Sequence, residues 1–182
     1  MTTSKRALLL VDIQNDFCEG GMLEVPEASQ IMTRVNELIL DASSHSETII
    51  ASRDWHTVDH ISFEDRGGPW PPHCVQDTHG AAFHPELNLP HSAVRVSKGT
   101  AFDQDAYSAF DGTQLDSFLK RHSVQSLRVV GLALDVCVRA TVLDALKLGF
   151  DVDLVSAGTR AVDPSGAEAV FEELRSAGAT IS

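Results

Sequence analysis

The chain has 182 residues and a formal net charge of −12 at pH 7. This length suits one hydrophobic core, so we expect a single domain over residues 1–182. The acidic balance argues against nucleic acid and anionic membrane surfaces as partners, because phosphate groups are bound by lysine and arginine. The first residues do not match a signal peptide, and the three cysteines form an odd set that suits no disulfide framework. We therefore expect a cytoplasmic protein with reduced thiols.

The predicted elements alternate between strand and helix along the chain. Short apolar runs predict buried parallel strands over residues 6–12, 48–52, 94–97, 127–131 and 152–155, and residues 180–181 form a last short strand. Apolar residues at helical spacing predict helices over residues 28–43, 113–122, 136–148 and 164–177. The sequence therefore predicts an α/β fold with three α/β/α layers and a mainly parallel central sheet. Its last edge is expected to be short or to be completed by a partner subunit.

One long segment interrupts this alternation. From His56 to about Ala93 the chain has little hydrophobic periodicity and many Pro, Gly and His residues. It also carries aromatic side chains such as Phe63 and Trp70, which are not typical of a disordered segment. A loop of this length inside a compact domain is usually functional. We therefore predict an insertion over about residues 54–93 that contributes to a site.

Polar groups follow four of the predicted strands. Asp12, Asp54 and Lys98 each lie at or just beyond a strand end, and the turn at residues 133–137 follows the strand at residues 127–131. Ligands of a doubly wound sheet bind outside the carboxyl ends of its strands. We therefore expect all four to surround one site, and their convergence is more informative than any one of them.

Cys137 is the candidate nucleophile. It falls in the first turn of the predicted helix, with Asp135 as the expected N-cap. The free N–H groups of a helix start lower a thiol pKa and suit the oxyanion of a tetrahedral intermediate. Taken alone, a free cysteine is more typical of a small buried side chain. The groups around it decide between the two interpretations.

Asp12 and Lys98 are the candidate partners of that thiol. A partly desolvated carboxylate at Asp12 has a raised pKa and can exchange protons with a thiol and a leaving group. The alternative is that Asp12 caps a turn, which is the favoured interpretation for Asn15 and Asp16. An ammonium at Lys98 near both groups favours the thiolate. A lone lysine after a strand is more often solvated.

Asp54 and His56 are candidate metal ligands, because residues i and i+2 of an extended chain face the same side. His73, which lies further along the long loop, is a third candidate, and His60 is a fourth possibility. Such donors suit zinc, manganese or iron(II) and leave positions for water or substrate. Other histidines fit a solvated position better, namely His45, His79, His91 and His122.

Five motifs occur in one order along the chain. They are LVDIQNDFCEGG (10–21), SRDWHTVDHISF (52–63), WPPHC (70–74), SKGT (97–100) and GLALDVCVRAT (131–141). With these motifs the chain resembles the nicotinamidase branch of the isochorismatase-like cysteine hydrolases over nearly its whole length. The candidate metal ligands Asp54 and His56, together with the motif WPPHC, narrow the resemblance to nicotinamidases and their close relatives.

The resemblance implies a role for each of the strand-end residues. It implies a catalytic triad of Asp12, Lys98 and Cys137. In that family a cis peptide shapes the oxyanion hole. Here this bond would join Leu132 to Ala133, and the donors would be the N–H groups of Ala133 and Cys137.

The resemblance also implies the metal ligands Asp54, His56 and His73. Phe17 and Trp70 match the positions that sandwich a pyridine ring, and Tyr107 is expected to line the same pocket. Some relatives place an extra histidine ligand in this loop, but not at the offset of His60. His60 is therefore expected beside the site, with ligation as the less favoured alternative.

The activity that the resemblance implies is hydrolysis of nicotinamide, and of pyrazinamide, through a Cys137 thioester. One divalent metal ion, zinc before iron or manganese, would orient the pyridine ring. A role in NAD salvage and a homo-oligomeric assembly are expected with this activity. Two alternatives stay open: another amidohydrolase of the same family that acts on a carbamoyl or other small amide, and a non-catalytic redox or binding protein that uses the thiol.

Overall fold

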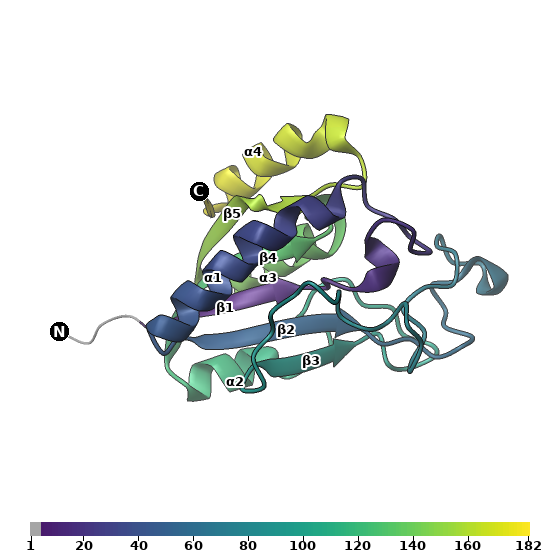
Figure 1. Cartoon of the computed structure of the whole chain (residues 1–182), viewed down its shortest axis with the longest axis horizontal. Coiled ribbons are helices and arrows are strands. Elements are labelled where there is room, and N and C mark those ends of the chain that lie inside the picture. Colours follow the sequence, from purple (N-terminus) through teal and green to yellow (C-terminus); the bar gives the residue numbers. More distant parts are fainter. Residues whose placement is uncertain (1–4) are drawn as a thin grey trace.

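A six-stranded sheet forms the centre of the computed structural model, which describes residues 5–182 (Figure 1). Its strands are β1 (Lys5–Val11), β2 (Thr48–Asp54), β3 (Val94–Lys98), β4 (Val124–Leu132), β5 (Asp151–Arg160) and β6 (Thr180–Ile181). The strand order is β3-β2-β1-β4-β5-β6, and every neighbouring pair is parallel. The parallel sheet predicted from the sequence is confirmed, including the short last strand.

Helices cover both faces of this sheet, which gives three layers (Figure 1). They are α1 (Met32–Ser44), α2 (Leu115–Arg121), α3 (Arg139–Lys147) and α4 (Ala167–Ala177). One hydrophobic cluster joins the sheet to α1, and a second joins its other face to α2, α3 and α4. No helix within residues 5–182 is long and apolar enough to cross a bilayer.

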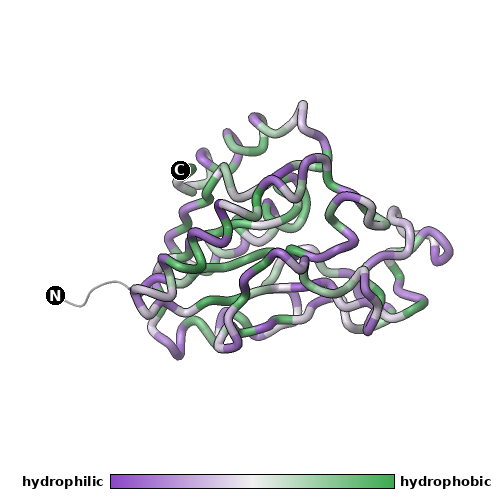
Figure 2. Tube along the Cα trace, viewed as in Figure 1, coloured by the Kyte–Doolittle hydropathy of each residue, from purple (hydrophilic) through white to green (hydrophobic). Residues whose placement is uncertain are grey.

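The first strand lies between these two clusters. Leu8 and Leu10 of β1 pack into the cluster that contains α1, whereas Ala7 and Leu9 pack into the opposite one. All four are fully buried or nearly so, and each buried leucine stabilises the fold by about 1.5–3 kcal/mol. A strand buried on both faces reads as a continuous apolar run, and the central strands are correspondingly hydrophobic in Figure 2.

Several helices begin differently from the sequence prediction. The first predicted helix opens with a 3-10 turn at Ala28–Ile31, and the last opens with another at Pro164–Gly166. The helix predicted at residues 136–148 begins instead with a π-helical turn at Leu134–Val138, before α3. Periodicity finds the apolar face of a helix but does not distinguish between these turn types. The π-helical turn matters most, because it carries Cys137.

Gly131 allows the end of β4 to lie directly against β1. Its φ is +130°, and a Cβ atom there would be 2.1 Å from the carbonyl oxygen of Val11. That oxygen belongs to a fixed strand, so no flexible side chain is able to move away. The close approach of β1 and β4 brings the residues after both strands to one place.

We predict that Gly131→Ala severely destabilises the fold, because backbone atoms of two central strands would have to separate. The matched control is Gly149→Ala, which also has a positive φ of +88° but no atom within 4 Å of the new Cβ. The control should cost only about 1–2 kcal/mol of backbone strain. Urea denaturation of both variants measures the difference, and equal free energies of unfolding would contradict the prediction.

Candidate active site

The carboxyl ends of four strands bring the predicted site residues together. Asp12 directly follows β1, Asp54 ends β2, Lys98 ends β3, and Cys137 lies in the turn after β4. The parallel register pairs Asp54 with Lys98, and it also aligns the last residue of β1 with β4. The point where β1 meets β4 is where the strand order reverses, and ligands of doubly wound sheets bind at such a point.

The ammonium of Lys98 is the centre of this cluster. Its Nζ lies 2.8 Å from Asp12 Oδ2, 2.5 Å from Asp54 Oδ1 and 3.6 Å from Cys137 Sγ. Burial alone would lower the pKa of Lys98, but the two carboxylates outweigh it and hold this pKa well above its usual value. The side chain is buried, so the interpretation of Lys98 as a solvated lysine is wrong.

Asp12 is placed to exchange a proton with the thiol. Its Oδ1 accepts a hydrogen bond of 2.8 Å from Ser52 Oγ, while Oδ2 faces Lys98 without an aligned donor among the described residues. Complete burial raises the pKa of Asp12, and the attraction of Lys98 only partly offsets this. The backbone has a φ of +49°, a left-handed conformation that costs a non-glycine residue about 1–2 kcal/mol. Strain of this kind is typical of functional positions.

Burial is the largest influence on the Cys137 thiol. Burial raises its pKa well above the usual value, and the nearby Lys98 ammonium does not compensate. The prediction of a lowered pKa from the helix start and Lys98 is therefore wrong: desolvation and the charge of Asp12 oppose both effects. An attacking thiolate consequently needs a base that accepts the proton, and Asp12 is the neighbouring group able to do so.

The segment before Cys137 also differs from the prediction. Asp135 makes no N-cap hydrogen bond, and the capping position is taken by Ala133. The Asp135 carboxylate accepts hydrogen bonds of 2.8 and 3.0 Å from the N–H groups of Val162 and Asp163, so it anchors the loop after β5 instead. The cis peptide expected between residues 132 and 133 is present.

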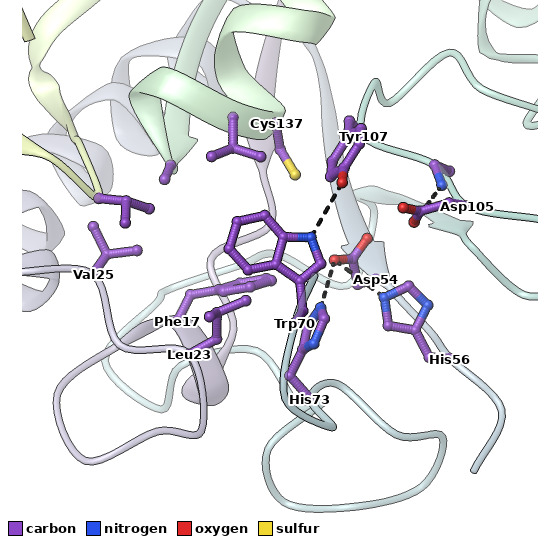
Figure 3. A pocket seen from close by; sticks show the side chains of 14 residues that line it. Phe17, Leu23, Val25, Asp54, His56, Trp70, His73, Asp105, Tyr107 and Cys137 are labelled. Atoms are coloured by element: carbon purple, nitrogen blue, oxygen red, sulfur yellow. Dashed lines mark hydrogen bonds and ion pairs between the residues drawn. The ribbon is translucent and has the colours of Figure 1, made fainter. Parts of the chain in front are cut away.

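Asp54, His56 and His73 place three metal-ligand atoms within 4.8 Å of one another (Figure 3). His56 Nε2 lies 3.4 Å and His73 Nε2 lies 3.8 Å from Asp54 Oδ2. The Nδ1 atoms of the two rings each contact a backbone carbonyl at 2.8 Å, that of Gly99 and that of Pro71. A carbonyl only accepts, so both Nδ1 atoms carry a proton, and in the neutral form of each ring Nε2 presents a lone pair toward Asp54.

These lone pairs and the carboxylate fit a divalent cation. Burial disfavours a charged Asp54, but Lys98 and the two histidines outweigh it, so the pKa of Asp54 lies well below its usual value. Nitrogen and carboxylate donors of this kind are ligands of zinc, iron and manganese. Hydrogen bonds from the far ring nitrogen to a carbonyl are typical of metal-bound histidines.

His60 is not part of this set. Its Nδ1 lies 2.7 Å from Ser62 Oγ and its Nε2 lies 2.8 Å from the carbonyl oxygen of Gln104, so both ring nitrogens have partners. The ring stacks on His56 with centroids 4.0 Å apart. The structure therefore places His60 behind the candidate ligand His56 and outside the three converging ligand atoms.

The pocket lies between the thiol and the metal-ligand atoms, with about 430 Å³ of space that partly opens to solvent. Phe17, Trp70 and Tyr107 line it as predicted, and Trp70 Nε1 donates a hydrogen bond of 3.1 Å to Tyr107 Oη (Figure 3). Lining residues that sequence reasoning missed are Leu23, Val25, Asp105, Ala106, Val136 and Val162. Their positions in the sequence give no signal, because separate loops meet only in the folded chain.

Known proteins resemble this chain over almost its whole length. A family model for the isochorismatase domain matches residues 6–182. The chain is 42% identical to the nicotinamidase of Escherichia coli (strain K12), over 97% of this chain and 93% of that protein. It is also similar to the crystal structure of Pyrococcus horikoshii pyrazinamidase in complex with zinc, with 46% identity, a TM-score of 0.95 and 98% of both chains covered. PnC1 from L. infantum in complex with nicotinate has 35% identity and a TM-score of 0.90, over 98% of this chain and 92% of that one.

We predict that iodoacetamide modifies Cys137 before Cys18 and Cys74 in the folded protein. Cys137 lines the pocket, whereas Cys18 and Cys74 are not among the residues that line it. Burial raises the pKa of all three thiols, so access of the reagent decides the order. Because the pKa of Cys137 is itself raised, its alkylation should accelerate as the pH rises above neutral. Peptide mapping by mass spectrometry measures the order, and equal labelling of Cys18 would contradict it.

Proposed function

The chain belongs to the isochorismatase family, and from this premise we propose that it is a nicotinamidase, a hydrolase that converts nicotinamide to nicotinate and ammonia. The observation that carries the proposal is one pocket in which a thiol with its acid–base partners faces three converging metal-ligand atoms. A small amide with a ring nitrogen fits both sides, because its carboxamide faces the thiol and its ring nitrogen faces the metal-ligand atoms. Nicotinate as the product makes the reaction a step of NAD salvage.

The aromatic side chains are suited to hold the ring of such a substrate. Phe17 and Trp70 offer faces for stacking, and the hydrogen bond from Trp70 fixes the neighbouring Tyr107. Asp54, His56 and His73 would hold a divalent ion, zinc in preference to iron or manganese, and this ion would act as a Lewis acid that orients and polarises the ring. Residues 54–93 then act as a metal-binding insertion. Pyrazinamide has the same shape, so it is a second substrate.

In the first half of the proposed reaction, Cys137 attacks the carboxamide carbon. Asp12 accepts the thiol proton as the carbon–sulfur bond forms, which the raised pKa of this carboxylate favours. The N–H groups of Ala133 and Cys137 stabilise the oxyanion, and each such donor contributes about 3–4 kcal/mol to transition-state stabilisation. The carbon–nitrogen bond then breaks, Asp12 protonates the leaving nitrogen, and ammonia departs from the thioester.

In the second half, water hydrolyses the thioester. Asp12, now ionised again, accepts a proton from the water as its oxygen attacks the acyl carbon. The carbon–sulfur bond breaks, and Asp12 returns the proton to the sulfur of Cys137. Lys98 stays protonated throughout, because both carboxylates hold it in that state. Its charge stabilises whichever anion is present at each step, the carboxylate of Asp12 or the thiolate of Cys137.

We predict that Cys137→Ala lowers ammonia release from nicotinamide by about 1000-fold or more, since no covalent intermediate forms. Cys18→Ala, which removes a buried thiol outside the pocket, should keep most of the activity. A coupled ammonia assay with nicotinamide, pyrazinamide and a carbamoyl compound measures the rates. Turnover of the carbamoyl compound alone would favour another amidohydrolase of the family, and no turnover of any amide would favour a redox or binding protein.

We also predict that His73→Ala loses bound zinc while His79→Ala keeps it. His73 Nε2 faces the carboxylate of Asp54, whereas the side chain of His79 is exposed and not among the three ligands. Dialysis against a zinc buffer followed by elemental analysis gives the metal content per chain. Equal zinc content in the two variants would show that the ligand assignment is wrong.

A further inference from the structure

Gln14 takes the place of a missing strand beside Asp54. The pairing of β1 with β2 ends at Val11 and Ser52, two residues before Asp54. The Gln14 side chain is fully buried, and its Oε1 accepts a hydrogen bond of 2.8 Å from the N–H of Asp54. Its Nε2 donates at 2.8 Å to the carbonyl of Asp54 and at 2.9 Å to that of Ala81. One amide therefore pairs with both backbone groups of a metal-ligand residue, as the peptide of a neighbouring strand would.

Asp16 holds the second segment of the metal site in a similar way. Its Oδ2 accepts a hydrogen bond of 2.7 Å from the N–H of Cys74, the residue after His73. Its Oδ1 accepts one of 3.1 Å from the N–H of Met22. A Cβ atom at Gly80 would lie 2.1 Å from the Asp16 carboxylate, so the loop passes directly over it. Asp16 is thus enclosed by the loop that carries His73.

We propose that Gln14 and Asp16 are positioning residues for the metal site, which set the spacing between Asp54 and His73 by holding the backbones of Asp54 and Cys74. This inference rests on the proposed function, because it takes residues 54, 56 and 73 as the ligands. These two side chains, both from the turn after β1, reach the end of β2 at Asp54 and the loop at Cys74. The turn interpretation of Asp16 from the sequence is therefore incomplete, since its carboxylate also spans to the distant loop.

The consequence is an effect on metal affinity. A metal ion needs its ligand atoms within a few tenths of an ångström of fixed positions. Asp54 and His73 belong to different segments, so their relative position depends on what ties these segments together. Groups that orient ligands from behind typically change metal affinity by about 10–100-fold when they are substituted. Gln14 and Asp16 bind the backbone rather than the ligand side chains. They therefore fix the position of the backbone from which each ligand side chain extends.

The first test is the zinc affinity of Gln14→Glu, measured by competition with a chromophoric chelator at fixed pH and ionic strength. The carboxylate still accepts from the Asp54 N–H but has no hydrogen for the two carbonyls, so alignment is lost. We expect zinc to bind at least 10-fold more weakly. A purely electrostatic effect would have the opposite sign, because the substitution brings a negative charge closer to a cation.

Asn36→Asp is the matched control. Asn36 Nδ2 donates to the carbonyl of Glu86 at 2.8 Å and its Oδ1 accepts from the N–H of Asn88 at 2.9 Å, so this variant makes the same amide-to-carboxylate change on a side chain that also pairs with loop backbone. Neither bond involves a metal-ligand residue or its neighbour in the chain, and the zinc affinity of this variant should stay within about 3-fold of the wild type.

Asp16→Glu gives an independent measurement if Gln14→Glu does not fold. It keeps the negative charge but moves the carboxylate by one methylene group away from its bonds to the N–H groups of Cys74 and Met22.

The outcomes separate this inference from the proposed function. Weaker zinc binding by Gln14→Glu or Asp16→Glu, in protein that circular dichroism shows to be folded, supports it, because neither variant loses a negative charge. Wild-type zinc affinity in folded variants, even with a lower melting temperature, means that both residues only stabilise the fold and overturns it. Absence of zinc binding by the wild-type protein overturns the metal site itself, and the positioning roles with it.

Discussion

The buried ammonium of Lys98 is the interaction on which the site depends. An isolated charge in a protein interior is prohibitively costly, so Lys98 requires the two carboxylates that it contacts. Those carboxylates need it equally, since both are buried. Asp54 divides its two oxygens between Lys98 and the histidines. The carboxylate of Asp54 therefore joins the metal-ligand residues to the residues around the thiol. A substitution on one side of the pocket changes the electrostatic surroundings of the other.

The parallel sheet is what makes this cluster possible. The carboxyl ends of its strands all lie on one side of the sheet. Residues at or just after the ends of β1, β2, β3 and β4 therefore meet, although they are far apart in the sequence. The four α-helices lie on the faces of the sheet and leave the carboxyl ends of the strands to loops and short helical turns (Figure 1). Where β1 has already ended, the side chain of Gln14 continues its hydrogen bonding to β2. The fold thus supplies the coarse placement of the site, and side-chain hydrogen bonds to backbone supply the fine placement.

The sequence predicts the part of this design that depends on pattern. Apolar runs locate the strands, and a polar residue after each run locates Asp12, Asp54 and Lys98. The hydrophobic pattern does not predict pKa values or the hydrogen-bond partners of individual side chains. The pKa of Cys137 depends on complete desolvation, and the bonding of His60 depends on Ser62 and the distant Gln104. Asp135 has the spacing of a cap but bonds across to the loop after β5. These outcomes follow from contacts between segments, which no local window of sequence contains.

The raised pKa of the Cys137 thiol has a consequence for selectivity in the proposed reaction. A thiolate at rest would react with oxidants and with any electrophile that enters the pocket. The raised pKa favours the neutral thiol, and in the proposed reaction its proton moves to Asp12 only as a bond to carbon forms. Reaction therefore requires a carbonyl held against the sulfur, with its oxygen within reach of backbone donors. In the proposed complex the aromatic side chains and the metal-ligand residues hold the far end of the substrate, so that recognition at one end of the pocket would determine when the thiol at the other end becomes nucleophilic.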